Sequence, residues 1–444
     1  MKTGNIYQLD GKVSLKQAIP LGMQHVLSMF VGNVSPLIIV CGMLNMPADQ
    51  KTMLVQNAMF IAGVVTLIQL YPVWKVGAGL PIVMGTSSGF LPTVQAAAGT
   101  YGYGAVLGAS LTGAIVEIIL GFFIKPLKKF FPPVVTGVVV VSIGLSLIPT
   151  GIKFFAGGIG AEDFGSLSNL FLGFLVMIII IFFMQFTKGF TRISAILIGI
   201  VVGYIVAIFM GKVDFSGVAA ASWFSMPQPF AFGFEFRIEV IIPIVIMYIA
   251  TAVETIGDIS GITMGGLDRE ATDKELSGGV LADGVGSAIA SCFGVLPNTS
   301  FSQNVGLVAM TKIVNRFVIM TGAIFLILAG FFPKLGAVVS AVPQSVLGGA
   351  TIIMFAMIAV SGMQLLFKQN MQGRNAMIVA LALGLGFGLG SVPDALQNLP
   401  EWARLIFAQS GIVVSFIVAV IMNFILPKDE ANSTVQTETV VAED

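Results

Sequence analysis

The stretch LPNTSFSQNVG, residues 296–306, places a dense polar run inside a strongly apolar sequence. Six of the seven positions 298–304 carry an amide or a hydroxyl, namely Asn298, Thr299, Ser300, Ser302, Gln303 and Asn304. The apolar run VLADGVGSAIASCFGV precedes them and LVAM follows. Buried polar groups need hydrogen-bond partners, so this stretch must find them in water, in another segment or in a bound solute.

The composition of the whole chain is that of a membrane protein. Of 444 residues, 56% are hydrophobic and 10% are charged, whereas a soluble domain carries about 25% charged residues. The mean hydropathy is +0.97, and apolar runs such as residues 171–186 and 195–210 suit the ~30 Å hydrocarbon core of a bilayer. The zero net charge excludes a general attraction to nucleic acid. One histidine and two cysteines do not make a typical structural zinc site, so we expect no metal and no cofactor.

The apolar segments predict an all-α integral membrane protein with 14 transmembrane segments, called spans 1–14 here. They begin near Gln17, Met53, Leu80, Tyr103, Phe131, Leu167, Ile193, Phe236, Gly278, Asn298, Phe317, Leu335, Ala376 and Ala403. The first apolar run is too long for a cleavable signal peptide and is interpreted as a true span. With the N-terminus inside, 16 of the 22 Lys and Arg residues fall in inner segments, as the positive-inside rule requires. We therefore expect both termini in the cytoplasm and a location in the inner (plasma) membrane of the cell.

Spans 3 and 10 share a pattern that predicts an internal repeat. Span 3 contains GLPIVMGTSSGFLPTV (79–94) and span 10 contains VLPNTSFSQNVGLVAM (295–310). Both have Leu-Pro, a Ser/Thr-rich run, a glycine and a short apolar stretch. Two seven-span halves must insert with inverted topology, and interrupted segments at matching positions point to a transport site. Extended backbone at membrane depth can survive by pairing, so these two segments are candidates to pair with each other. The alternative is that 296–306 is only a polar loop.

Four acidic residues fall clearly inside predicted spans: Glu117, Glu254, Asp258 and Asp283. A carboxylate at the bilayer centre costs about 2.5–3.5 kcal/mol on insertion scales, so each one is a candidate functional residue. Thr251, Glu254 and Asp258 follow at i, i+3 and i+7, which puts them on one helix face. Glu117 is about two turns from a basic loop, and we expect it to reach the cytoplasmic surface.

Asp283 begins a second polar stripe on span 9, which continues with Ser287, and His25 begins a third on span 1. Asp258 can instead be a cap or loop contact, and His25 can instead be a structural hydrogen-bonding group in span packing. Glu254 and Asp283 lie deeper in their spans. Because a buried carboxyl group can hold a proton at neutral pH, these two residues suit proton-coupled uptake. No Walker A pattern supports transport driven by ATP.

Five motifs spread over nearly the whole chain resemble those of one transporter family. QNVGLVAMTK (303–312) matches a signature of an acidic or amide residue, Asn, any residue, Gly, four residues, Thr, and a basic residue or Gly. GMQHVLSMFVG on span 1, MGTSSGF on span 3, ETIGD on span 8 and LADGVGSAIASCFG on span 9 complete the set. The chain thus resembles the nucleobase–ascorbate transporters, also called nucleobase:cation symporter family 2, and in particular its xanthine and uric acid permeases.

The resemblance implies an architecture. Members have two inverted repeats of seven spans, a core domain that holds the substrate, a gate domain that forms a homodimer, and short antiparallel strands in spans 3 and 10. On this chain the core domain would comprise residues 17–124 (spans 1–4) and 236–333 (spans 8–11), the gate domain residues 125–235 (spans 5–7) and 334–427 (spans 12–14), and the cytoplasmic ends residues 1–16 and 428–444.

The resemblance also implies site residues. Glu254 resembles the span 8 carboxylate that hydrogen-bonds the base, and Gln303 resembles the signature residue that binds its other edge. Asn304 resembles the amide that supports this geometry. Ser88 and Phe90 fall in the span 3 strand, where backbone and aromatic contacts to the base are expected.

Three further residues resemble parts of the proton-coupling machinery of the family. Asp283 resembles the span 9 carboxylate needed for coupling, and His25 resembles the span 1 histidine that organises the site. Asp258 joins Glu254 and Asp283 as a candidate proton-coupling group. Bacterial members import the base together with a proton, and sodium coupling is the alternative.

Gln303 bears on the substrate. Uracil-type members usually carry Glu at this position, whereas xanthine and urate members usually carry Gln. An amide offers both a donor and an acceptor to the lactam edge of a purine. The resemblance therefore favours an oxidised purine, xanthine above urate, with guanine left open. The span 8 segment also departs from the uracil pattern, because Thr255 follows Glu254 and no second histidine is present.

Three other functions stay in competition. One is a uracil permease of the same family. Another is an anion transporter of the related sulfate-transporter fold, but that group usually carries a soluble C-terminal regulatory domain, which we do not expect here, and two deep carboxylates would repel anions. The third is an integral-membrane enzyme, which no nucleophile–base pair or metal cluster supports. We predict a proton-coupled purine transporter, not an enzyme.

Overall fold

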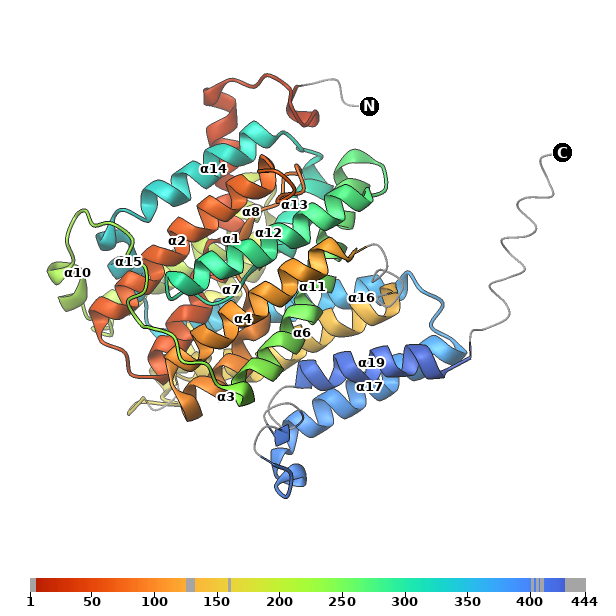
Figure 1. Cartoon of the computed structure of the whole chain (residues 1–444). Helices are drawn as coiled ribbons and strands as arrows, with labels where there is room; N and C mark the ends of the chain where they lie inside the picture. The colour runs from red at the N-terminus through yellow and green to blue at the C-terminus, as the bar shows by residue number, and fades with distance from the viewer. Residues whose placement is uncertain are drawn as a thin grey trace.

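Helices, many of them long and apolar, make up most of the computed structural model, which describes residues 5–124, 132–158, 161–400, 403–404, 407 and 411–427 (Figure 1). Within these residues, eight helices are long and apolar enough to cross a membrane, and the pair α14 (Arg316–Ala329) and α15 (Pro333–Ser340), bent by 89°, would make a ninth. The eight are α1 (Leu15–Met43), α2 (Ala48–Leu70), α4 (Tyr103–Phe122), α6 (Pro133–Phe155), α7 (Leu167–Phe186), α11 (Ile238–Leu267), α16 (Gln344–Phe367) and α17 (Gly373–Ser391). The predicted helical class with many apolar spans is confirmed, and the number 14 stays a prediction.

Further helices lie among the described residues. They are η1 (Asn5–Tyr7), α3 (Leu91–Tyr101), α8 (Phe190–Ile193), α9 (Ala195–Phe209), α10 (Ser216–Ala220), α12 (Asp273–Cys292), α13 (Ser302–Thr311), η4 (Pro393–Leu396) and α19 (Gly411–Ile425). The helix α12 begins with a capping box, because the side chains of Thr272 and Glu275 each bond the backbone N–H of the other. This cap fixes the start of the helix that carries Asp283.

The predicted start of span 12 differs from the structure by several residues. Span 12 was expected to begin near Leu335, but that residue lies in α15, and the long helix α16 begins only at Gln344, directly after Pro343. The sharp bend before α15 and the helix-starting proline explain the shift. The predicted start of span 5 at Phe131, residues 1–4 of the N-terminal segment, residues 125–130 of the gate domain and the tail 428–444 lie outside the described residues.

Two three-residue strands form a small sheet within the helical bundle. The strand β1 (Met84–Thr86) pairs antiparallel with β2 (Asn298–Ser300), with Gly85 opposite Thr299. Further backbone bonds extend the pairing, from Ser87 N to Pro297 O (2.8 Å) and from Phe301 N to Val83 O (3.0 Å). All residues of both strands are buried. The strand β1 leads through η2 (Ser88–Phe90) into α3, and β2 leads into α13, so both half-helices begin at the crossing.

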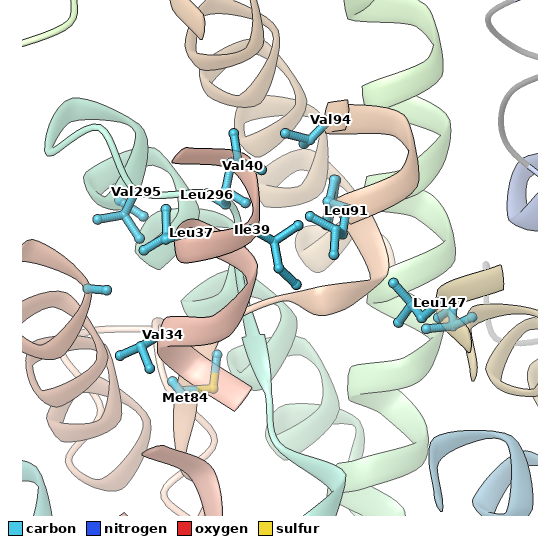
Figure 2. Packing of buried hydrophobic residues seen from close by; sticks show 14 of the residues in the cluster. Val34, Leu37, Ile39, Val40, Met84, Leu91, Val94, Leu147, Val295 and Leu296 are labelled. Atoms are coloured by element: carbon cyan, nitrogen blue, oxygen red, sulfur yellow. The ribbon is translucent and has the colours of Figure 1, made fainter. Parts of the chain in front are cut away.

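Apolar side chains hold this crossing in place. Figure 2 shows α1 packed among the segments next to the strands, with Leu37 beside Val295 and Leu296, and with Ile39 directed toward Leu91. In a bilayer such contacts stabilise the fold mainly through close van der Waals packing, because lipid is as apolar as these side chains. The strands are therefore fixed by a core that combines α1 with both halves of the chain.

A second close contact joins α6 and α16. A Cβ on Gly348 of α16 would lie 2.1 Å from the backbone nitrogen of Phe155, and one on Gly144 of α6 would lie 2.3 Å from that of Ala359. The two helices therefore touch backbone to backbone. In Figure 1, α17 and α19 lie beside each other at one side of the molecule, with α6 as their neighbour.

We predict that Gly348→Val destabilises the protein by at least about 2 kcal/mol, because the added methyl groups meet backbone that cannot rotate away. Thermal unfolding of the purified protein in detergent measures the loss. The matched control is Gly384→Val in α17, where an added Cβ meets nothing within 4 Å. Equal stability of the two variants would contradict the close contact.

Candidate substrate site

Hydroxyl groups from two helices bond the first residue of each strand. Thr66 of α2 accepts from Met84 N (2.9 Å) and donates to Met84 O (3.5 Å). Ser287 of α12 likewise accepts from Asn298 N (2.9 Å) and donates to Asn298 O (3.1 Å). In each strand, the N–H and C=O of the first residue that point away from the partner strand are thus bonded to a side chain. Backbone groups at membrane depth need such partners because no water is available there.

Asn33 of α1 holds the other end of β1. Its Oδ1 accepts from the Thr86 backbone N–H (2.8 Å) and from the Thr86 hydroxyl (3.0 Å), and its Nδ2 donates to Ala58 O (3.2 Å). Asn33 is fully buried. One amide therefore ties α1 and α2 to the strand.

The crossing of the strands borders a small cavity. Its volume is about 30 Å³, and Glu254 of α11, Gln303 of α13 and Ser88 of η2 line it. Space of this size holds about one water molecule and no purine. The carboxylate and the amide predicted to bind a base thus face one cavity, which is closed around a small volume in this conformation.

Two predicted substrate residues do not line this cavity. Phe90 is fully buried and packs edge-to-face on Tyr248, with ring centroids 4.8 Å apart. Asn304 is also fully buried, and its Nδ2 lies 3.0 Å from His25 O and 3.1 Å from His25 Nδ1. The bonds between Asn304 and His25 therefore hold α13 against α1, next to Gln303.

The candidate coupling carboxylates bond hydroxyls around the strands. Asp258 accepts from Ser300 (2.6 Å) and from Ser302 (2.8 Å). Asp283 is fully buried and accepts from Thr255. Asp258 therefore bonds β2 and the first residue of α13, whereas Asp283 bonds α11, and their roles in coupling stay predictions.

The expected place of Glu117 is wrong. Its side chain is 1% exposed and lies inside the protein, not at a surface. Neither carboxylate oxygen has a hydrogen-bond partner among the described residues. The residue lies on the side of α4 that packs against α12, so the distance in sequence to a basic loop was misleading.

Two larger cavities adjoin the small one. One, of about 420 Å³, is lined by Glu254, Asp258 and Lys368. The other, of about 340 Å³, is lined by Gln303 and Arg192. Volumes of 300–1,000 Å³ are typical of ligand sites. A solute of nucleobase size therefore fits next to Glu254 and Gln303, with a basic residue in each cavity wall. Among the described residues, no group of three or more His, Cys, Asp and Glu side chains could hold a metal ion.

Comparison with known proteins identifies the family. Residues 16–395 match the family model Xan_ur_permease, described as the permease family. This chain belongs to the permease family. The permease is 38% identical to the xanthine permease of Bacillus subtilis over 430 residues, which cover 96% of this chain and 98% of that one. It is 36% identical to the uric acid permease PucK of Bacillus subtilis over 422 residues (94% and 97%) and 34% identical to the xanthine permease XanQ of Escherichia coli K12 over 438 residues (95% and 94%).

Solved structures show the same fold at low identity. The transmembrane domain of a cyanobacterium bicarbonate transporter, BicA, has a TM-score of 0.59 and 15% identity, and the alignment covers 93% of the permease and all of that chain. The murine anion transporter Slc26a9 in its inward-facing state has a TM-score of 0.61 and 12% identity, with 91% and 68% covered. These structures show the fold alone, and the family resemblance is confirmed by the family model and the curated relatives. The permease is a multi-pass membrane transporter and not an enzyme.

Sequence reasoning missed the residues that hold the strands. Asn33 and Thr66 were not singled out, although an amide and a hydroxyl inside apolar helices were visible signals. Nothing in the sequence told which backbone group each one bonds, because that depends on which helices pack beside the strand. Ser287 was noticed only as part of the stripe that begins at Asp283.

Proposed function

We propose that this permease imports an oxidised purine nucleobase, xanthine in preference to urate, together with a proton, by alternating access. The observation that carries the proposal is the presence of Glu254 and Gln303 on one cavity at the strand crossing. A carboxylate accepts N–H bonds from the base, and an amide both donates to and accepts from a lactam edge. The names of the relatives, which include xanthine and uric acid permeases, support the same class.

The proposed transport cycle needs room and a path. The two larger cavities share Ser302 and Gly306 with each other and reach Glu254 and Gln303. Lys368 and Arg192 fall on the cytoplasmic side in the predicted topology, so this conformation would be open inward. Closing on the cytoplasmic side and opening toward the outside would complete the exchange between two states.

The finer architecture belongs to the same proposal. It comprises 14 spans in two inverted repeats, a core domain with the strands, a gate domain that forms a homodimer, and a plasma-membrane location with both termini cytoplasmic. The equivalent hydroxyl bonds of Thr66 to β1 and of Ser287 to β2 support two related halves.

Uptake of radiolabelled xanthine into cells expressing the permease tests the function. The competitors are unlabelled urate, uracil, guanine, hypoxanthine and sulfate, each with and without a protonophore. We expect xanthine uptake that the protonophore abolishes and that uracil does not inhibit. Inhibition by uracil alone would favour the uracil alternative. Movement of sulfate with no base uptake would favour an anion transporter.

We predict that Gln303→Glu lowers kcat/KM for xanthine by about 10- to 100-fold, because a carboxylate cannot donate to the purine and two acceptors then face each other. Uracil should become a better competitor in the same uptake assay. Gln372→Glu, at an exposed position before α17, is the matched control and should transport normally. Unchanged xanthine uptake by Gln303→Glu would exclude Gln303 from base recognition.

A further inference from the structure

Two hydroxyl groups connect the carboxylates of Asp258 and Asp283. Ser300 lies within hydrogen-bond distance of Asp258 (2.6 Å), and Thr255 is hydrogen-bonded to Asp283. The two hydroxyl oxygens lie 3.3 Å apart, and either can donate to the other. All four side chains are buried. They make a continuous row of oxygen atoms from one carboxyl group to the other.

This row is complete only when it carries one extra proton. Each hydroxyl has a single proton, so two hydroxyls between two ionised carboxylates leave one of the three links without a hydrogen. A proton on Asp258 directs the bonds from Asp258 to Ser300, from Ser300 to Thr255 and from Thr255 to Asp283. A proton on Asp283 reverses all three bonds. Passing from one state to the other moves one proton along the row, with each hydroxyl receiving one proton and giving one away.

Glu117 stands beside the Asp283 end of this row. A Cβ on Gly284 of α12 would lie 2.8 Å from Ile118 N, and one on Gly121 of α4 would lie 3.0 Å from Leu281 N. Glu117 and Asp283 therefore belong to the part of each helix that touches the other. Their carboxyl groups interact electrostatically.

No cation balances these carboxyl groups within the described residues. The helix α12 brings Asp283 to Glu117, and α11 brings the phenol of Tyr248, which interacts with both carboxyl groups. The helix α3, which also packs on α4, carries no Asp, Glu, Lys, Arg or His. Asp258 and Glu254 of α11 only add negative charge around Asp283.

Two ionised carboxylates buried together without a cation would cost several kcal/mol each, so the pair must hold a proton. A second observation supports a proton bound between Glu117 and Asp283. Both oxygens of Glu117 and Oδ1 of Asp283 are buried without a hydrogen-bond partner among the described residues. A proton shared between the two carboxyl groups would give one oxygen of Glu117 and Oδ1 of Asp283 a bond.

We propose that Glu117 is the buried end of a proton relay. The relay runs from Asp258 through Ser300 and Thr255 to the Asp283–Glu117 carboxyl pair. Asp258 lines the cavity of about 420 Å³, so protons can enter the relay there from water. The inference rests on the proposed proton-coupled function, and it assigns to Glu117 a role in holding the proton rather than in contacting the base.

Reconstituted protein with a pH-sensitive dye inside the vesicles tests the relay. Proton movement driven by xanthine and the counterflow of labelled xanthine are measured on the same vesicles. We expect Thr255→Val to lower proton movement by about 100-fold, a normal size for the loss of a positioned proton carrier, and to lower counterflow much less. Thr255→Ser keeps the hydroxyl and should restore proton movement. Thr255→Val with normal proton movement would overturn the relay.

Glu117→Gln is the second test, with Glu162→Gln at an exposed loop position as its matched control. Infrared spectra of the purified protein should show the C=O stretch of a protonated carboxyl group in the wild type and the control, and a weaker band in Glu117→Gln. Glu117→Gln should also lose the proton movement that xanthine drives. An unchanged band together with normal coupling would overturn the role of Glu117.

The assays separate this inference from the proposed function. If wild-type vesicles take up xanthine without moving protons, or use a sodium gradient instead, the proposed proton coupling is wrong. The relay is then excluded as well. If the wild type is proton-coupled and the variants stay coupled, only the relay is wrong. Should Glu117→Gln fail to fold, the infrared band of the wild type and the comparison of Thr255→Val with Thr255→Ser still decide the outcome.

Discussion

Glu254→Gln is expected to lower kcat/KM for xanthine by at least about 100-fold without unfolding the protein. The substitution keeps the shape of the side chain but replaces one acceptor oxygen with an NH₂ donor. A base whose N–H groups point at Glu254 then loses hydrogen bonds to a charged group, each contributing about 1.5–3 kcal/mol. Two such bonds correspond to about 100-fold or more in the rate constant. Initial rates of xanthine uptake measure the effect.

A control on the same helix sharpens this test. Glu239→Gln changes a carboxylate in the first turn of α11, far along the helix from the cavity, and should transport like the wild type. Equal thermal stability of the two variants would show that the loss belongs to the site. Wild-type uptake by Glu254→Gln would mean that the base is held by other groups.

The second large effect is expected for Asn33→Leu, which should destabilise the protein by about 2–5 kcal/mol and abolish transport. Leucine fits the volume but leaves the buried Thr86 N–H and hydroxyl without their shared acceptor. The end of β1 would then move, and Ser88 on the cavity wall with it. Thermal unfolding in detergent and xanthine uptake provide the two measurements.

Thr86→Val is the matched control for that variant. It removes only the hydroxyl bond and keeps the bond from the Thr86 N–H to Asn33 Oδ1. We expect it to cost about 1 kcal/mol, clearly less than Asn33→Leu. If both variants are equally stable, Asn33 does not hold the strand.

The parts of the fold that sequence reasoning reached are those where polar residues interrupt apolar sequence. Polar groups in lipid must be paired, so the runs around 84–90 and 298–304 stand out in any reading of the chain. In the structure they contain β1 and β2, and Glu254 and Gln303 line one cavity beside them. These runs could be located because the polarity of each segment is visible in its own sequence.

The parts that sequence reasoning did not reach depend on which segments pack together. Glu117 was expected at the surface because a lysine follows two turns later, yet α12 covers it. The packing of the Phe90 ring on Tyr248 of another helix was also not foreseen, and contact of Phe90 with the base stays a prediction. Helical periodicity tells which residues share a face, but not which helix covers that face. Tertiary packing therefore decided both cases.

The pairing of β1 with β2 has a consequence for biosynthesis. Residues 84–86 leave the ribosome and enter the membrane long before residues 298–300 have been made. During that interval one edge of β1 has no partner strand, while Thr66 and Asn33 bond its backbone on the other side. An unpaired edge invites wrong contacts, and such intermediates are prone to aggregate. The nascent first half of the permease should therefore depend on the insertion machinery or on chaperones until the second half arrives, and a chain truncated before β2 should be degraded rather than accumulate.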